Sequence, residues 1–181
     1  MPIMLAYAAR RESLMALKSL LEEALDAWQF ARDGVIGEVR NLPDEAMTRV
    51  VGARTVAELV HHIAESGLVM AGELTRADGD FQRQPYPAFL AEYAGAMEHP
   101  TGKAELIALL ERTHREGRDR IRKAGEARLL EPIRQFNGEP ARRLTWMHHG
   151  IGHEEYHRGQ MALGARLLGH VPALTKLIHG E

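Results

Sequence analysis

Apolar residues recur at steps of three and four along most of the chain, which is the period of one face of an α-helix. The first such run starts at Leu14 and continues through Leu17, Leu21, Ala24, Trp28, Ala31, Val35 and Val39. It predicts a long first helix that ends near the segment Asn41–Asp44.

The same pattern predicts three further long helices. After a short helical turn, Thr55 and Glu58 form a T-x-x-E capping box that opens the second helix. A loop rich in Gly and Pro is expected at residues 76–87, because these residues interrupt regular helices. The other helices are expected at residues 88–97 (a short one), from about Thr101 to Gly125, and from about Ala141 to Leu168, where Gly169 and Pro172 end the last one.

Strand signals hardly appear. A single Asn137-Gly138 pair between two short segments indicates a β-hairpin near residues 132–142. Four long helices with unequal connections predict an all-α protein with the architecture of a four-helix bundle. A chain of 181 residues is long enough for one domain with a real core and short for two, so we expect a single domain over residues 1–181.

Composition narrows the class of protein. The hydrophobic fraction of 45% and the charged fraction of 27% are typical of a soluble globular protein, and no apolar run approaches the roughly 20 residues that span a bilayer. The first residues lack the basic segment and long apolar stretch of a secretory signal, so we expect a cytoplasmic protein without a membrane partner. A net charge of -2 with scattered basic residues gives no electrostatic reason to bind nucleic acid.

The chain contains no cysteine. This excludes disulfides, thiolate nucleophiles supplied by the protein, and metal sites built on cysteine. Any metal ion must therefore bind to His, Asp, Glu or water.

Histidines are concentrated in the predicted fourth helix. Four of the ten lie within ten residues, at His148, His149, His153 and His157. The last three are four residues apart, so they lie on one stripe of the helix, which Gln160 extends. Two histidines at positions i and i+4 of a helix can hold one metal ion, but a third ligand must come from elsewhere.

A second cluster, His61 and His62, lies in the predicted second helix. His62 is on the same side as Leu59 and Val69, whereas His61 points further from the apolar face, so His62 is the better candidate for an inward ligand. An error of one residue in this register would exchange the two. A pair from one helix and one residue from another would leave open positions on the metal for water or substrate.

The alternative for each of these residues is a purely structural role. Adjacent histidines are often solvated, and a histidine on a half-apolar face is often only hydrogen-bonded in place. Surface positions are expected for the acids Glu154 and Glu155 and for the isolated histidines His99, His114, His170 and His179. The glycines at positions 150, 152, 159 and 164 weaken the helix, so some of them are expected where another helix or the metal comes close.

Two segments resemble a known family. TVAELVHHIAES and, about ninety residues later, HEEYHRGQMA are similar to the motifs of the DinB-like (DinB/YfiT) superfamily, and the resemblance spans roughly Leu14 to Leu168. It implies an up-up-down-down four-helix bundle in which three histidines bind a divalent metal ion, commonly zinc or nickel. The matching positions are His62, His153 and His157, while His149 lies outside the pattern and is expected to support the site.

The resemblance also implies a function. Characterised members include transferases and isomerases that use a low-molecular-weight thiol such as mycothiol or bacillithiol. It therefore implies a metal-dependent enzyme that activates an external thiol for transfer to an electrophilic small molecule, and a chain without cysteine is compatible with this. Two alternatives remain: a metal-dependent hydrolase, and a stress-related protein that binds a metal or a small molecule without catalysis.

The resemblance further suggests a homodimer. The first helix carries apolar residues outside its main stripe, and a single bundle covers only part of such a surface. These residues are Leu20, Leu25, Phe30 and Ile36.

Overall fold

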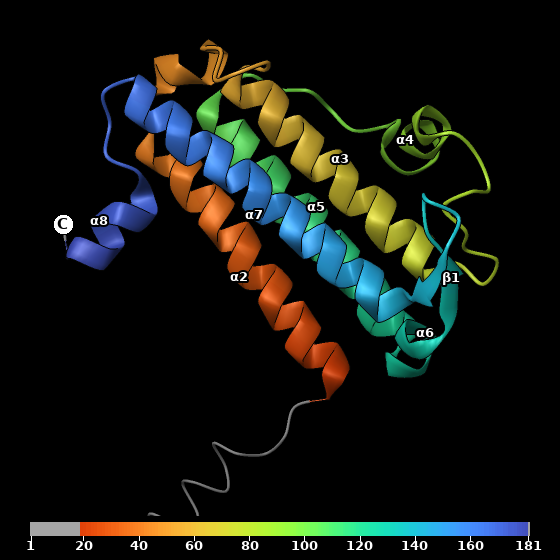
Figure 1. The fold of residues 1–181 in the computed structure, drawn as a ribbon. Coiled ribbons are helices and arrows are strands. Elements are labelled where there is room, and N and C mark those ends of the chain that lie inside the picture. Colours follow the sequence, from red (N-terminus) through yellow and green to blue (C-terminus); the bar gives the residue numbers. More distant parts are fainter. Residues whose placement is uncertain (1–18, 181) are drawn as a thin grey trace, which may run out of the picture.

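The computed structural model describes residues 19–180. Within this range, four long helices pack side by side: α2 (Leu20–Asn41), α3 (Val56–Thr75), α5 (Lys103–Ala124) and α7 (Arg143–Leu167) (Figure 1). The predicted four-helix bundle is confirmed. The expected start of the first helix at Leu14 lies outside the described residues.

Helices α2 and α7 run in one direction, and α3 and α5 run in the other (Figure 1). Helix α2 packs against α7 and α5, and α3 packs against α5 and α7. Around the bundle the helices follow in the order α2, α7, α3 and α5, so two that run up are followed by two that run down. Along the chain, the order of directions is up, down, down and up. Consequently α3 and α7, which are far apart in sequence, are antiparallel neighbours.

Shorter elements connect the long helices. They are the 3-10 helix η1 (Asp44–Thr48), α4 (Tyr86–Ala94), α6 (Glu126–Leu130), the strands β1 (Pro132–Arg134) and β2 (Pro140–Arg142), and α8 (Ala173–His179). The strands form the predicted hairpin, with Ile133 paired to Ala141. Helices α6 and α8 were not predicted from the sequence.

Local sequence signals fix the ends of several elements. The Thr55 side chain accepts a hydrogen bond from the Glu58 backbone, and the Glu58 side chain accepts one from the Thr55 backbone, so the predicted capping box opens α3. Gly125 ends α5 with a φ of 84°, and Gly138 turns the hairpin with a φ of 86°. Residues other than glycine rarely adopt such φ values.

The core consists of two apolar clusters, one toward each end of the bundle. The first includes Leu59 of α3 and Met161 of α7, and the second includes Val69 of α3 and Met147 of α7. The segments of α3 and α7 between these residues carry the histidine clusters. The histidines therefore lie where the two halves of the core meet.

The structure corrects some expectations about burial. Leu25 and Ile36 of α2 are buried within the bundle, whereas Leu20 and Phe30 are exposed as expected. His114 is buried on α5 against the Trp28 ring, with 4.5 Å between ring centroids, and does not lie on the surface. None of the helices in the part of the chain described combines the length and apolar character that crossing a bilayer requires.

Candidate metal centre

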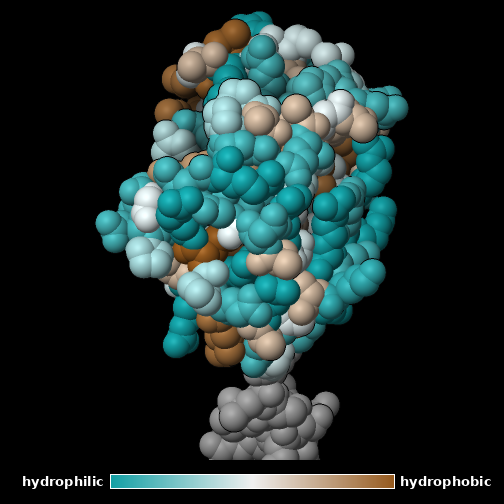
Figure 2. All heavy atoms as spheres, turned by 90° about the vertical axis from the view of Figure 1, so that its right-hand side faces the viewer, coloured by the Kyte–Doolittle hydropathy of each residue, from teal (hydrophilic) through white to brown (hydrophobic). Residues whose placement is uncertain are grey.

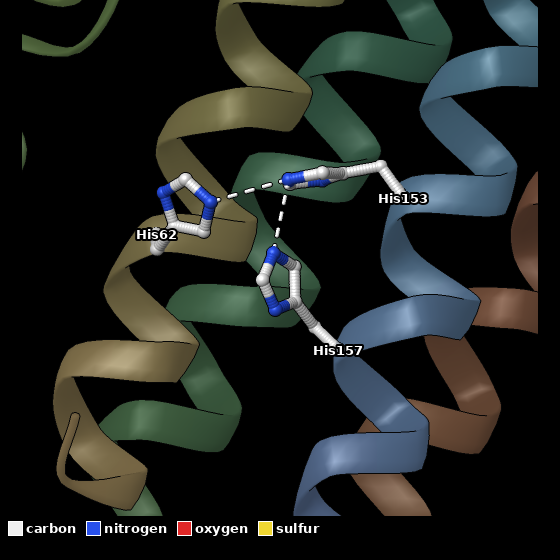
Figure 3. Close-up of side chains that lie close together, drawn as sticks. All are labelled: His62, His153 and His157. Carbon is white, nitrogen blue, oxygen red and sulfur yellow. Dashed lines mark hydrogen bonds between the residues drawn. The ribbon is translucent and has the colours of Figure 1, made fainter. Parts of the chain in front are cut away.

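Three histidine side chains from two helices point toward one another. His62 comes from α3, and His153 and His157 come from successive turns of α7 (Figure 3). The Nε2 atom of His153 lies 3.2 Å from Nε2 of His62 and 3.0 Å from Nε2 of His157. One nitrogen from each of the three residues lies within 4.8 Å of the others.

These short contacts cannot all be hydrogen bonds. An imidazole nitrogen carries either one proton or one lone pair in the ring plane, so Nε2 of His153 can bond only one of its two neighbours. A divalent ion would accept a lone pair from each of the three rings, and this would remove the conflict. Ligand nitrogens of a tetrahedral zinc site are about 3.3 Å apart, given zinc–nitrogen distances of about 2.0 to 2.1 Å, so the observed spacing fits such an ion.

Burial keeps the three rings neutral at physiological pH. It lowers the pKa of His62 to about 4 and that of His153 to about 4, and the neighbouring histidines of the cluster act in the same direction. Burial also lowers the pKa of His157. Because neutral imidazole is the form that binds metal ions, protons compete weakly for this site.

Gln160 orients the His157 ring. Its Oε1 atom accepts a hydrogen bond from Nδ1 of His157 at 2.8 Å. This bond holds the ring proton on Nδ1 and leaves the lone pair of Nε2 directed toward the other two histidines. Metal-bound histidines commonly have such a partner on the second ring nitrogen.

Glu154 contradicts the expectation of a surface acid. Its carboxylate is buried against α2, where it accepts hydrogen bonds from Trp28 Nε1 at 2.6 Å and from Arg32 at 2.7 and 2.8 Å. His153, Glu154 and His157 match the H-E-x-x-H spacing of helical zinc sites, in which the glutamate is the general base. Here the carboxylate is committed to Arg32, so the match in spacing does not extend to that role.

The other two candidate histidines lie outside the cluster. His61 is buried, donates a hydrogen bond to the Pro100 carbonyl at 2.8 Å and stacks on His99. His149 is exposed and lies beside Trp146, with 5.4 Å between ring centroids. The structure thus groups His62, and neither His61 nor His149, with His153 and His157.

Two of the four glycines of α7 allow close packing. A Cβ atom at Gly150 would lie 2.0 Å from Met70 Sδ, and one at Gly164 would lie 2.4 Å from Val51 Cγ1. At Gly152 and Gly159 a Cβ atom would meet nothing within 4 Å. Close approach therefore explains Gly150 and Gly164, and nothing in the described residues explains the other two.

A cavity of about 340 Å³ opens directly beside the histidines. His62 and His153 form part of its wall. The rest of the wall consists of Ser66, Val69, Met70, Phe81, Tyr86, Phe136, Trp146, His149 and Gly150. Apart from His149 and Gly150, none of these additional residues has a sequence signal that marks it as part of a site.

Comparison with family models identifies the family of this chain. The family model of the DinB superfamily matches residues 6–161. The chain belongs to the DinB superfamily. The match includes all three clustered histidines and most of the bundle.

Solved structures add a match at the level of fold. YfiT from Bacillus subtilis, described as a probable metal-dependent hydrolase with an unusual four-helix bundle topology, superimposes with a TM-score of 0.63 and 13% sequence identity. The match covers 83% of this chain and 88% of YfiT. Comparison with curated proteins finds no match. At this identity the likeness to YfiT shows a shared fold.

Proposed function

We propose that this DinB superfamily protein is a metal-dependent enzyme that transfers an external low-molecular-weight thiol to a small electrophile. Its metal ligands are His62, His153 and His157, and zinc or nickel suits three imidazole ligands. A divalent ion held there would act as a Lewis acid and favour the ionised, nucleophilic form of an external thiol. Three protein ligands leave room for that thiol, and the neighbouring cavity offers room for the electrophile.

The observation that carries the choice of a thiol over water is the arrangement of carboxylates. Hydrolysis at a helical H-E-x-x-H site relies on the glutamate as a general base. In this chain Arg32 and Trp28 occupy the Glu154 carboxylate, and no Asp or Glu is among the described residues that line the cavity. An ionised thiol needs no general base, so these residues match a thiol nucleophile better than water.

A second pocket suits the polar part of the thiol. It has a volume of about 200 Å³ and includes Arg54 and Gln160, the residue that orients His157. The Arg54 charge acts on all three clustered histidines and lowers their pKa values, so its guanidinium lies near the site. We infer that Arg54 attracts the carboxylate of an acidic thiol on this side, opposite the larger cavity.

Hydrolysis is the second candidate. It is favoured by the description of YfiT as a probable metal-dependent hydrolase. In that case His149, which lines the cavity, is the available base for water.

The metal site is tested by elemental analysis of untagged protein purified without added metal. We expect about one divalent ion per chain, and loss of stoichiometric binding in His62→Ala, His153→Ala and His157→Ala. The matched control is His149→Ala, which removes an imidazole from the same helix but should retain the ion. Retention of the ion in all three ligand variants would contradict the assignment.

The reaction is tested with a panel of epoxides, alkyl halides and activated alkenes, together with bacillithiol, mycothiol or a surrogate thiol. Metal-loaded protein should consume both thiol and electrophile, and the rate should fall to background in the His153→Ala variant. Ester or amide hydrolysis that depends on His153, without any thiol addition, would replace the transferase with the hydrolase. Tight ligand binding without either reaction would favour a binding protein.

A further inference from the structure

The cavity beside the histidines has an uncharged wall. None of the described residues that line it is Asp, Glu, Lys or Arg. Away from the proposed metal ligands His62 and His153, a charged group entering this cavity would lose hydration without gaining an opposite charge, which is unfavourable. The wall therefore selects for neutral molecules, and its volume of about 340 Å³ is at the small end of the range for ligand pockets.

Aromatic side chains from three separate segments form much of this wall. Phe81 comes from the loop between α3 and α4, Phe136 from the tip of the hairpin, and Trp146 from the first turn of α7. The Phe81 ring centroid lies 4.8 Å from that of Phe136 and 4.5 Å from that of Trp146. The rings are tilted against one another, which suits contact with the face or edge of another flat ring.

Polar contacts hold the hairpin in this position. Arg134 of β1 forms an ion pair with Asp80, with 2.6 Å between Nη2 and Oδ2, and the Gln82 side chain donates to the Phe136 carbonyl. Phe136 nevertheless remains 40% exposed, as a preformed aromatic surface. A ligand in the cavity would cover it without any need for the hairpin to fold around the ligand.

The cavity also offers one localised polar contact. Ser66 lies one helical turn after His62 on α3, and its hydroxyl is 3.2 Å from the Tyr86 hydroxyl. Burial raises the pKa of Tyr86, so the hydroxyl stays protonated and can donate a hydrogen bond. A ligand oxygen near this pair would be held on the histidine side of the aromatic wall.

We propose that the electrophilic substrate of this enzyme is a compact, uncharged aromatic molecule with one oxygen acceptor such as a carbonyl. The aromatic ring of this substrate lies against Phe81, Phe136 and Trp146. The Tyr86 hydroxyl donates a hydrogen bond to the oxygen of the substrate. Figure 2, which views the side that carries α4 and the hairpin in Figure 1, shows mainly hydrophilic residues with small hydrophobic groups between them. This face therefore suits a small molecule better than a broad protein partner. This inference rests on the proposed function for the reaction of the substrate, whereas the predicted binding of the substrate does not depend on that function.

Binding can be tested without turnover by titration calorimetry with unreactive probes. Benzylacetone is a neutral aromatic ketone, and hydrocinnamate carries a carboxylate on a similar frame. In metal-free protein, where no ion can capture the carboxylate, benzylacetone should bind about tenfold more tightly than hydrocinnamate. An aliphatic ketone with the same number of carbon atoms should also bind more weakly, because it lacks the flat ring.

Variants of the residues in the cavity wall test the aromatic contact and the hydrogen bond separately. Phe136→Ala should weaken benzylacetone about tenfold, and Phe136→Leu, which keeps an apolar side chain, should weaken it less. The matched control is Phe30→Ala, which removes another exposed phenylalanine, from α2, and should leave affinity unchanged. Tyr86→Phe should weaken benzylacetone but leave propylbenzene, which has no oxygen, unaffected.

Equal or tighter binding of hydrocinnamate, or unchanged benzylacetone affinity in Phe136→Ala, would overturn the inference. Circular dichroism of each variant checks that the bundle is intact. Since these measurements need neither metal nor thiol, their outcome is independent of the proposed transferase activity. Failure of thiol transfer with normal benzylacetone binding would instead refute the proposed function alone.

Discussion

The buried contact between Glu154 and Arg32 allows a direct test of what the acid in HEEYH does. Both side chains are almost completely buried, with exposed side-chain fractions of 3% and 1%. In Glu154→Gln, the amide oxygen can still accept from Trp28, but the amide NH2 group faces the Arg32 Nε–H, so two donors meet. The variant also leaves the Arg32 charge buried without its counterion.

Breaking such a pair from one side costs about 3 to 5 kcal/mol of unfolding free energy. For a domain of this size, each kcal/mol shifts the melting temperature by about 2 to 4 °C, so Glu154→Gln should melt roughly 6 to 20 °C below the wild type. Removing the second charge as well, in Arg32→Met with Glu154→Gln, should restore most of this loss because no unpaired charge remains. Urea denaturation of the metal-free proteins measures the unfolding free energies of the single and the double variant relative to the wild type.

Activity separates the structural role from a catalytic one. If Glu154 only ties α7 to α2, the folded double variant should bind metal and turn over substrate at close to the wild-type rate. A stability of Glu154→Gln within about 1 kcal/mol of the wild type would refute the energetic argument. A stable double variant that binds metal but has no activity would show that the carboxylate takes part in the reaction.

Three further predictions concern other parts of the molecule. Burial lowers the pKa of His114 to about 3, so from its ordinary value of 6.5 downward the unfolded chain takes up a proton that the folded chain does not, and stability falls with falling pH. His114→Phe should abolish this loss. Between neutral pH and pH 4.5, the unfolding free energy of the variant relative to the wild type should therefore rise by about 2 to 3 kcal/mol, which urea denaturation at the two pH values can measure. Arg54→Ala should raise KM about two- to fivefold for a thiol that carries a carboxylate and leave KM unchanged for 2-mercaptoethanol, as steady-state kinetics can measure. We also predict a homodimer, since Phe30 and Leu177 remain exposed at 71% and 77%, and sedimentation showing only monomer at micromolar concentration would exclude it.

The sequence predicted the elements that have local signals. The capping box at Thr55 and Glu58, the Asn137-Gly138 turn and the spacing of the apolar residues each depend on a few neighbouring positions, so the long helices and the hairpin agree with the structure. Helices α6 and α8 have five and seven residues, which is too short for a periodic pattern to emerge.

The burial of Glu154 depends on another helix. Its neighbours in sequence are polar, and its partners are 122 and 126 residues away. A signal was nevertheless present, because Arg32 follows Trp28 by one helical turn and interrupts an otherwise apolar stripe. A charged residue in such a stripe requires a buried counterion, and Glu154 is the residue that the fold supplies.

The cavity had no comparable signal. Phe81, Phe136 and Trp146 lie in a loop, a hairpin and a helix, and only the packing of those three segments brings the rings together. The histidines were easier to identify because two of the three lie on one helix at a spacing that the helix itself determines.

The arrangement of helices around the bundle has a thermodynamic consequence. The three proposed metal ligands and the cavity wall both join α3 to α7, so an ion and a ligand would each favour the same closed spacing of these two helices. Two ligands that stabilise one state help each other to bind, and the factor by which the ion tightens the ligand equals the factor by which the ligand tightens the ion. We therefore expect benzylacetone to slow the removal of the metal by a chelator, although its predicted contacts include none with the ion.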